Sequence, residues 1–315
     1  MVAEFDLIEK YFAPLAGEGG LDLLDDAAII TPKANFDFIL TKDMLIESIH
    51  FFGDDDPASI AWKLLSVNMS DLAAKGASPV GYLMGIGFPN SPDDAFLQAF
   101  TRGLEEAQNF YGIQLLGGDT VKTPKALTLS LTAIGELPAG TMVKRRTASV
   151  GDSIYVSGTL GDSAIALAYR QKGEIHPVLD IRYTRPTARM DLSPIIRAFA
   201  SSCADVSDGL IADLSHILCD QGAKVEIDAL PLSDQARQYT SDNKAARNII
   251  HSGGDDYELV FTIPARHEKA LLRAISDKGL TRVTKIGVVT AEKRITLLDK
   301  SGSEIPLQVG GYQHF

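Results

Sequence analysis

The sequence predicts an α/β protein of two domains, and three observations carry this prediction. The chain has 315 residues, and an average domain has about 150. Along the chain, segments with the alternating apolar pattern of strands take turns with segments that have the three-to-four-residue pattern of helices. Between 138 and 152 the apolar fraction falls while Pro, Gly and consecutive basic residues cluster, which is typical of a linker. We therefore predict domains over 1–140 and 150–315.

The first half contains both kinds of pattern. Helices are predicted over 2–12, 57–76 and 91–112, and strands over 36–43, 113–119 and 126–137. Pro57 and Gly76 bound the central helix, because proline suits a first helical turn and glycine a C-terminus. The strand at 36–43 is expected to end at Asp43, and the run at 113–119 is expected to end in an acidic turn, Gly117-Gly118-Asp119.

The second half repeats this style. Strands are predicted over 153–158, 224–227 and 258–263, and helices over 161–172, 187–201 and, after a turn, within 205–222. The Gly-Gly-Asp sequence returns as Gly253-Gly254-Asp255. Because Gly and Asp are common turn residues, we interpret both copies as turns.

Composition narrows the classes of function. Hydrophobic residues make up 45% and charged residues 23%, as in a soluble folded protein. The net charge of −11 and a pI of about 5.0 argue against nucleic acid and anionic membranes as partners. Two cysteines, Cys203 and Cys219, are too few for a disulfide framework. No targeting or membrane-spanning segment is visible, so a cytoplasmic location is expected.

Aspartates gather at the ends of apolar runs or in the turns that follow. They are Asp25, Asp26, Asp43, Asp71, Asp119, Asp205, Asp208, Asp255 and Asp256. In α/β proteins such edges converge on one crevice, and crowded carboxylates without His or Cys favour Mg²⁺. The alternative is that each aspartate serves a turn or a helix cap.

Three further positions have two interpretations each. The backbone N–H groups and the hydroxyl of Ser207, in Asp205-Val206-Ser207-Asp208-Gly209, are placed to hold a phosphate at a helix start, or the motif is a plain cap. Arg145 is suited to phosphate or is a solvated linker residue. His50 is either functional or simply packed. The P-loop, protein-kinase and Gly-x-Ser-x-Gly motifs are absent from the sequence.

Taken together, these motifs resemble the thiamine-monophosphate kinase family. The matching segments are Leu24-Asp25-Asp26-Ala27-Ala28, Thr41-Lys42-Asp43-Met44-Leu45, His50-Phe51, 67–77, Leu116-Gly117-Gly118-Asp119-Thr120, Gly158-Thr159-Leu160-Gly161-Asp162, 205–209, 252–259 and Gly311-Tyr312-Gln313-His314-Phe315. The segments span nearly the whole chain, and their order and spacing make the resemblance specific. The resemblance implies ATP-dependent phosphorylation of thiamine monophosphate to thiamine diphosphate by Mg²⁺-assisted direct transfer, with a related ATP-dependent synthetase or a non-catalytic nucleotide-binding homologue as alternatives.

The resemblance also implies a fold and an assembly. The N-terminal α/β domain would bind ATP and metal and contribute strands to a dimeric barrel, and the C-terminal α+β domain would complete the active site. The expected partners are ATP, thiamine monophosphate and a second copy of the chain.

Site residues follow from the resemblance position by position. It implies Mg²⁺ ligation around Asp26, Thr41, Lys42, Asp43, Asp71, Asp119, Asp205 and Asp208. It implies ATP contacts at Gly118, Asp119, Arg145 and Ser207, and substrate contacts at His50, Asp256 and Tyr312. Two positions depart from the family pattern: Leu24 stands where glycine is usual, and Lys42 stands where Thr or Ser is usual. The Lys42 ammonium either replaces one cation or points away.

Overall fold

The computed structural model describes residues 4–243 and 247–306. The chain divides into two compact units: unit 1 comprises Met1–Leu72 and Ala77–Gly140, and unit 2 comprises Ala73–Gly76 and Thr141–Phe315. Each unit is built on its own sheet. Among the described residues, no helix is both long and apolar enough to cross a membrane.

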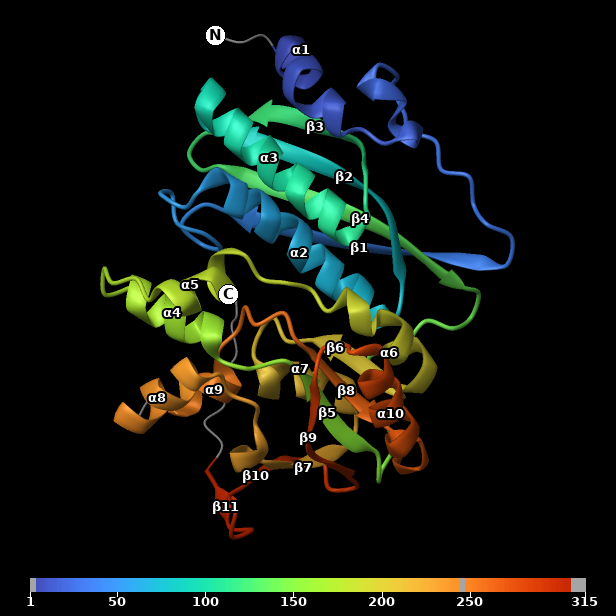
Figure 1. The fold of residues 1–315 in the computed structure, drawn as a ribbon, viewed down its shortest axis with the longest axis vertical. Helices are drawn as coiled ribbons and strands as arrows, with labels where there is room; N and C mark the ends of the chain where they lie inside the picture. Colours follow the sequence, from blue (N-terminus) through green and yellow to red (C-terminus); the bar gives the residue numbers. More distant parts are fainter. Residues whose placement is uncertain (1–3, 244–246, 307–315) are drawn as a thin grey trace. The chain divides into compact units, whose positions relative to one another are not determined.

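Unit 1 is a sheet with helices on one face (Figure 1). Its elements are α1 (Glu4–Leu7), η1 (Ile8–Phe12), η2 (Ala13–Leu15), η3 (Glu18–Leu23), β1 (Phe36–Ile46), α2 (Pro57–Lys75), β2 (Ser78–Phe88), α3 (Asp94–Tyr111), β3 (Leu115–Lys122) and β4 (Thr128–Pro138). The strand order is β1-β4-β2-β3, with antiparallel pairs except for the parallel pair β2–β3. Leu64 on α2, Phe100 on α3 and Leu131 on β4 are fully buried, so the core lies between the helices and the sheet.

The two long helices are confirmed with small shifts. α2 begins at Pro57 as predicted. α3 ends before Gly112, whose φ of 67° is the left-handed conformation that glycine allows. The start of α3 differs from the prediction of a helix from 91: Asp93 is the N-cap and accepts the N–H of Phe96, and the helix begins at Asp94.

Two strands of unit 1 run farther than predicted. β1 does not end at Asp43 but continues to Ile46, because β4 pairs with it along its whole length. The predicted turn at Gly117-Gly118-Asp119 is wrong. These residues lie inside β3, where Met84 and Gly85 of β2 pair with Gly118 and Asp119.

Unit 2 is a larger mixed sheet with several short helices (Figure 1). Its elements are β5 (Ser153–Ser157), α4 (Asp162–Arg170), α5 (Pro177–Thr184), η4 (Met190–Leu192), α6 (Ser193–Phe199), β6 (Ser202–Asp205), α7 (Leu210–Leu218), β7 (Gly222–Glu226), η5 (Ile227–Ala229), α8 (Asp234–Asp242), α9 (Ile249–Ser252), β8 (Leu259–Ile263), η7 (Ala265–His267), α10 (Glu268–Lys278), β9 (Val283–Thr290), β10 (Ile295–Leu298) and β11 (Glu304–Ile305). The strand order is β11-β10-β7-β9-β5-β8-β6. Its core joins Tyr155, Phe261 and Leu271.

The sequence patterns predicted the helices of unit 2 less accurately than those of unit 1. The predicted helix over 187–201 is only η4 and α6, since Pro194 in the first turn of α6 has no N–H to continue a helix from upstream. α5 was missed, although Pro177 stands at its start. The strand predicted over 258–263 and the helix after Gly209 are both present.

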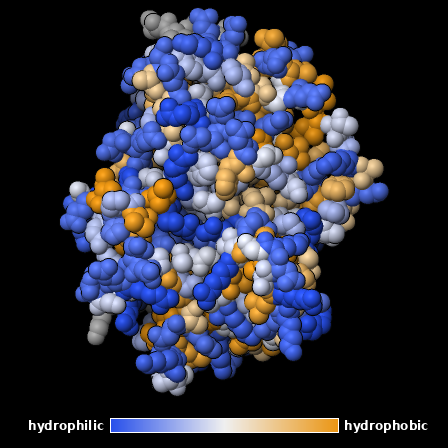
Figure 2. All heavy atoms as spheres, in the orientation of Figure 1, coloured by the Kyte–Doolittle hydropathy of each residue, from blue (hydrophilic) through white to orange (hydrophobic). Residues whose placement is uncertain are grey.

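Exposed apolar side chains are not spread evenly. On unit 1, the even-numbered residues of β1 project to the face of the sheet away from the helices, and among them Leu40 is 66% exposed. On unit 2, hydrophobic atoms gather over α4 and α5 at the left of Figure 2, and Val178 and Ile181 of α5 are exposed.

Candidate functional site

The first group of predicted site residues lies on the helix-covered face of the unit 1 sheet. Thr41 and Asp43 are two residues apart on β1, so both side chains project to the same face. The Thr41 hydroxyl donates a hydrogen bond to Asp71 Oδ2 on α2. Thr41, Asp43 and Asp71 are all half-buried. The strand and the helix thus bring hydroxyl and carboxylate oxygens together at one place.

Lys42 projects to the opposite face. Its ammonium group donates a hydrogen bond to Ser130 Oγ on β4. It lines a pocket of about 630 Å³ whose other lining residues include Asp25, Asp26, Gly118, Asp119 and Thr132. Because strand residues alternate between faces, the predicted ligands of unit 1 form two sets: Thr41, Asp43 and Asp71 on one face, and Asp26 and Asp119 beside Lys42 on the other.

Gly118 is a position where only glycine fits. A Cβ atom added there would lie 1.9 Å from the carbonyl oxygen of Met84 on the neighbouring strand. The missing side chain lets β3 approach β2 closely and leaves backbone at the pocket wall. Asp119 follows it as an exposed residue.

His50 lies in the turn after β1. Its Nδ1 accepts the N–H of Ile46 at 3.0 Å, and its carbonyl oxygen accepts a hydrogen bond from Lys63 Nζ at 3.0 Å. The Ile46 contact orients the imidazole ring, and the Lys63 contact ties the backbone of the turn to α2.

The second group lies in unit 2, in the loop between β6 and α7. Asp205 ends β6 and is 4% exposed. The backbone N–H groups of Ser207, Asp208 and Gly209 all donate to one oxygen, Oδ2 of Asp213, at 3.0, 3.0 and 3.2 Å. The prediction that these N–H groups face a phosphate is therefore wrong in this structure, because an internal carboxylate already occupies that position. The alternative of a plain cap is not met either, because Gly209 is the N-cap of α7 and no side chain of the motif caps the helix.

Asp213 is an unusual aspartate. Burial raises its pKa to about 7, the nearby charge of Asp208 acts in the same direction, and the three N–H donors act against it. Across residues 4–243 and 247–306, one group of three potential metal ligands lies within 4.8 Å, and it comprises Asp208, Asp213 and the exposed His216.

The Gly253-Gly254-Asp255 segment runs beside this loop. Asp255 N–H donates to the carbonyl of Ser207 at 2.9 Å. Farther along, Tyr257 N–H donates to the carbonyl of Val206, and Val206 N–H donates to that of Glu258. A Cβ on Gly254 would lie 2.3 Å from Ser207 O. Two motifs about 50 residues apart in the sequence are thus held together by their backbones.

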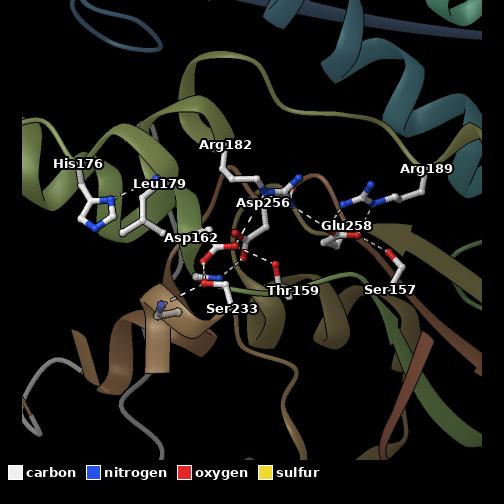
Figure 3. Close-up of polar contacts among 12 residues, drawn as sticks. Ser157, Thr159, Asp162, His176, Leu179, Arg182, Arg189, Ser233, Asp256 and Glu258 are labelled. Atoms are coloured by element: carbon white, nitrogen blue, oxygen red, sulfur yellow. Dashed lines mark hydrogen bonds and ion pairs between the residues drawn. The ribbon is translucent and has the colours of Figure 1, made fainter. Parts of the chain in front are cut away.

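Glu258 is a fully buried carboxylate between two arginines (Figure 3). Arg182 Nη2 donates to it at 2.8 Å and Arg189 Nε at 2.6 Å, and Ser157 Oγ donates at 2.6 Å. Burial alone raises the pKa of Glu258, but the Arg189 hydrogen bond and the charges of both arginines outweigh it and lower the pKa. The residue stays ionised within its cluster.

Asp256 lies inside the same unit (Figure 3). It is 1% exposed; its Oδ2 accepts Gly161 N–H at 2.8 Å, while its Oδ1 has no hydrogen-bond partner. Burial raises its pKa well above the usual value. The structure therefore places this side chain inward, because the chain turns at Asp255 and Tyr257, which both have positive φ. The predicted substrate contact of Asp256 stays a prediction that needs this carboxylate to face outward.

The structure gives little information on the last two predicted residues, Arg145 and Tyr312. Arg145 is exposed, and its carbonyl accepts a hydrogen bond from the Ser202 hydroxyl. Tyr312 lies outside the described residues.

Comparisons with known proteins decide the family. Residues 24–137 match the AIR synthase related protein, N-terminal domain, and residues 149–300 match the corresponding C-terminal domain. Thiamine-monophosphate kinase of Salmonella typhimurium is 39% identical, with 99% of this chain and 98% of that protein covered. The chain belongs to the thiamine-monophosphate kinase family.

Solved structures of the thiamine-monophosphate kinase family share the fold. The enzyme from Stenotrophomonas maltophilia superposes with a TM-score of 0.85 at 36% identity, covering 96% of this chain and 98% of that one. A structure described as AaThiL complexed with AMPPCP and TMP superposes with a TM-score of 0.78 at 31% identity, covering 100% of this chain and 97% of that one. The mixed α/β fold with two sheets is therefore that of this kinase family.

Sequence reasoning missed the groups that support this kinase family's motifs in unit 2. Asp213, Arg182 and Arg189 contact the motif segments 205–209 and 252–259 without belonging to either, and Glu258, which lies within the second segment, was given no role. One signal was present: Asp213 interrupts the apolar face of α7 between Leu210 and Leu214, which are both fully buried, and a charged residue at such a position needs a partner.

Proposed function

We propose that this chain transfers the terminal phosphoryl group of ATP to thiamine monophosphate and so produces thiamine diphosphate. The observation that carries the proposal is the likeness to thiamine-monophosphate kinases over 99% of the chain, together with the related structure described as a complex with AMPPCP and TMP. Both reactants are polyanions and the protein is itself acidic. Phosphoryl transfer depends mainly on alignment and charge neutralisation, so the acidic loops need cations to work.

Mg²⁺ is the cation that suits these residues. The proposed ligands are Asp26, Thr41, Asp43, Asp71 and Asp119 in unit 1, and Asp205 and Asp208 in unit 2. They offer oxygen atoms only, and the hydroxyl of Thr41 already lies against the Asp71 carboxylate, which fits a hard cation. Bound Mg²⁺ supplies charge neutralisation of phosphate oxygens.

The remaining predicted residues have binding roles in this proposal. Gly118, Asp119, Arg145 and Ser207 contact ATP, and His50, Asp256 and Tyr312 contact the substrate. The Gly118 backbone is open to the pocket, and His50 is oriented by the Ile46 N–H. We propose direct transfer between the bound reactants, without a phosphorylated enzyme. Labelled phosphate on the protein after incubation with ATP alone would contradict that step.

A homodimer belongs to the proposal as well. The face of the unit 1 sheet away from the helices exposes Phe38, Leu40, Met44 and Leu83, and an apolar sheet face of this kind is typical of an interface. A second copy closing a barrel over it would bury these side chains. Leu40→Glu should shift the mass in solution from dimer to monomer. The two cysteines are free thiols, which supports a cytoplasmic location.

The first test is a steady-state assay with Mg²⁺-ATP and thiamine monophosphate, in which ADP and thiamine diphosphate are both measured. We expect equal amounts of both products. Asp71→Asn and Asp205→Asn should lower kcat by about 100-fold or more because each removes a proposed ligand charge. Asp220→Asn, an exposed residue of unit 2, is the matched control. ADP without thiamine diphosphate would favour a related synthetase, and ATP binding without turnover would favour a non-catalytic homologue.

Lys42 separates the two interpretations of that position. If its ammonium replaces a cation beside Asp26 and Asp119, Lys42→Thr should need a several-fold higher Mg²⁺ concentration for half-maximal rate. Ser130→Ala, which removes only the hydrogen-bond partner of Lys42, is the control. An unchanged Mg²⁺ dependence in Lys42→Thr would mean that the ammonium is not part of the cation set.

A further inference from the structure

Asp213 concentrates an unusual number of donors on one atom. Its Oδ2 accepts the N–H groups of three consecutive residues, Ser207, Asp208 and Gly209. The side chain is 3% exposed and lies in the first turn of α7. In the described part of the chain, these three N–H groups donate hydrogen bonds to Asp213 and to no other element.

Consecutive N–H groups that point inward form a concave nest for an anion. In unit 2 the anion is part of the chain, so the nest is already filled. Without it, three N–H groups would lose their acceptor, which is costly for a loop whose Gly209 is buried. The shape of residues 207–209 therefore depends on the acceptor oxygen that Asp213 places at this position.

The other side of the loop is held by different contacts. Asp255 N–H donates to Ser207 O, and the absence of a side chain at Gly254 permits this approach. With both edges of the backbone engaged, the half-buried side chains of Ser207 and Asp208 are the loop's groups left to meet a ligand.

We propose that Asp213 is a positioning residue, an internal carboxyl group that shapes the 207–209 loop so that Ser207 and Asp208 can bind the metal–nucleotide. The inference rests on the proposed function. Asp213 itself touches neither reactant. It is not a metal ligand through Oδ2 in the group with Asp208 and His216, because an oxygen that accepts three N–H groups has no lone pair left for a cation.

Kinetics of Asp213→Asn and Asp213→Ala provide the first test. Asparagine keeps an acceptor oxygen without the charge, and alanine removes both. We expect the half-saturating concentrations of ATP and Mg²⁺ to rise by about tenfold or more in Asp213→Ala and by less in Asp213→Asn. The KM for thiamine monophosphate should stay within about twofold. Asp220→Asn makes the same chemical change at an exposed site and should leave all three values unchanged.

Chemical rescue of activity by a small carboxylate distinguishes a positioning role from a general contribution to stability. Asp213→Ala vacates a space that three N–H groups surround, so formate should restore part of the activity in a saturable way, whereas chloride at equal ionic strength should not. A uniform loss of kcat with no change in the ATP and Mg²⁺ dependence, and with no rescue by formate, would overturn the proposal.

Amide hydrogen exchange tests the geometry without any turnover. Peptides spanning 205–209 should exchange at least about tenfold faster in both Asp213 variants, and formate should slow the exchange again in Asp213→Ala. Peptides from β5 and β8 should be unchanged. Equal exchange over 205–209 in wild type and variants would refute the positioning role. If the variants exchange faster over 205–209 as expected but the wild type makes no thiamine diphosphate, the proposed function alone is refuted.

Discussion

The acidic motifs of the two units are positioned in different ways. In unit 1, Thr41, Asp43 and Asp119 lie on regular strands, and alternation along β1 and β3 decides which face each one occupies. In unit 2, Asp208 lies in an irregular loop whose backbone is held by Asp213, while the adjacent segment is held by Glu258 and its arginines. A strand positions a carboxylate by its own hydrogen-bond ladder. A loop needs buried polar partners to do so.

This difference implies that substitutions of the acidic residues lower stability more in unit 2 than in unit 1. Asp119 is exposed and Asp43 half-buried, whereas Glu258 is fully buried and Asp213 and Asp256 nearly so. Buried charges without partners cost far more than exposed ones. The following predictions test the contrast, beginning with the largest effect.

Glu258→Gln should have the largest effect on stability. It removes the charge that neutralises Arg182 and Arg189 inside unit 2, and breaking a buried ion pair typically costs about 3–5 kcal/mol. We expect the free energy of unfolding in urea to fall by about that amount. Asp119→Asn on the strand should change it by no more than about 0.5 kcal/mol.

Glu292→Gln is the control for the chemical change, because its side chain is 66% exposed in an ion pair with Arg294. Equal losses in the Glu258 and Asp119 variants would remove the contrast between loop and strand.

Gly118→Ala should have an intermediate effect on the free energy of unfolding. It tests whether a regular strand also contains a position that does not tolerate substitution. The new Cβ would meet Met84 O at 1.9 Å, and forcing atoms into a packed site costs about 1–3 kcal/mol. Gly85, the partner of Asp119 on β2, is the matched control, since its Cβ would meet only Ser130 Cβ at 3.7 Å. Urea unfolding should separate the two alanine variants, and a tolerated Gly118→Ala would mean that β2 and β3 move apart easily.

Asp256→Asn should have the smallest effect, and its sign depends on pH. Burial raises the pKa of Asp256, so the folded state binds this proton more tightly than the unfolded state does. The wild type therefore loses stability from this group as the pH rises above about 4, the unfolded value. Asparagine has no such dependence. The stability of the variant relative to wild type should therefore increase as the pH rises from 5 to 8.

Thermal unfolding of both proteins at several pH values measures this difference. A difference that is constant with pH would show that folding does not raise the pKa of Asp256. An accompanying rise in the KM for thiamine monophosphate would support the predicted substrate contact.

Sequence reasoning worked best where the signal was local. Pro57 and Gly112 correctly bounded α2 and α3, because capping and helix termination depend on a few neighbouring residues. It failed at Gly117-Gly118-Asp119, where two glycines indicated a turn but pairing with β2 extends the strand. It also failed for the phosphate nest at 207–209, because the competing anion, Asp213, was not recognised as a partner of that loop.

The two Gly-Gly-Asp copies illustrate this limit. They are identical in sequence, yet one lies within β3 and the other follows α9 in an irregular segment with Asp255 at positive φ. In both, the second glycine approaches a carbonyl from another part of the chain, Met84 O or Ser207 O. The local sequence indicated that a backbone comes close, but not which one.

By itself the sequence predicted the α/β class from periodicity, an acidic set of candidate site residues from the positions of its aspartates, and the kinase family from the resemblance of its motifs. Only the tertiary structure decided which face each strand residue occupies, that Asp256 points inward, and that Asp213 and Glu258 hold the unit 2 motifs. The physical reason is that hydrogen bonds and buried ion pairs form between residues far apart in sequence. Their geometry exists only once the sheets have set the register.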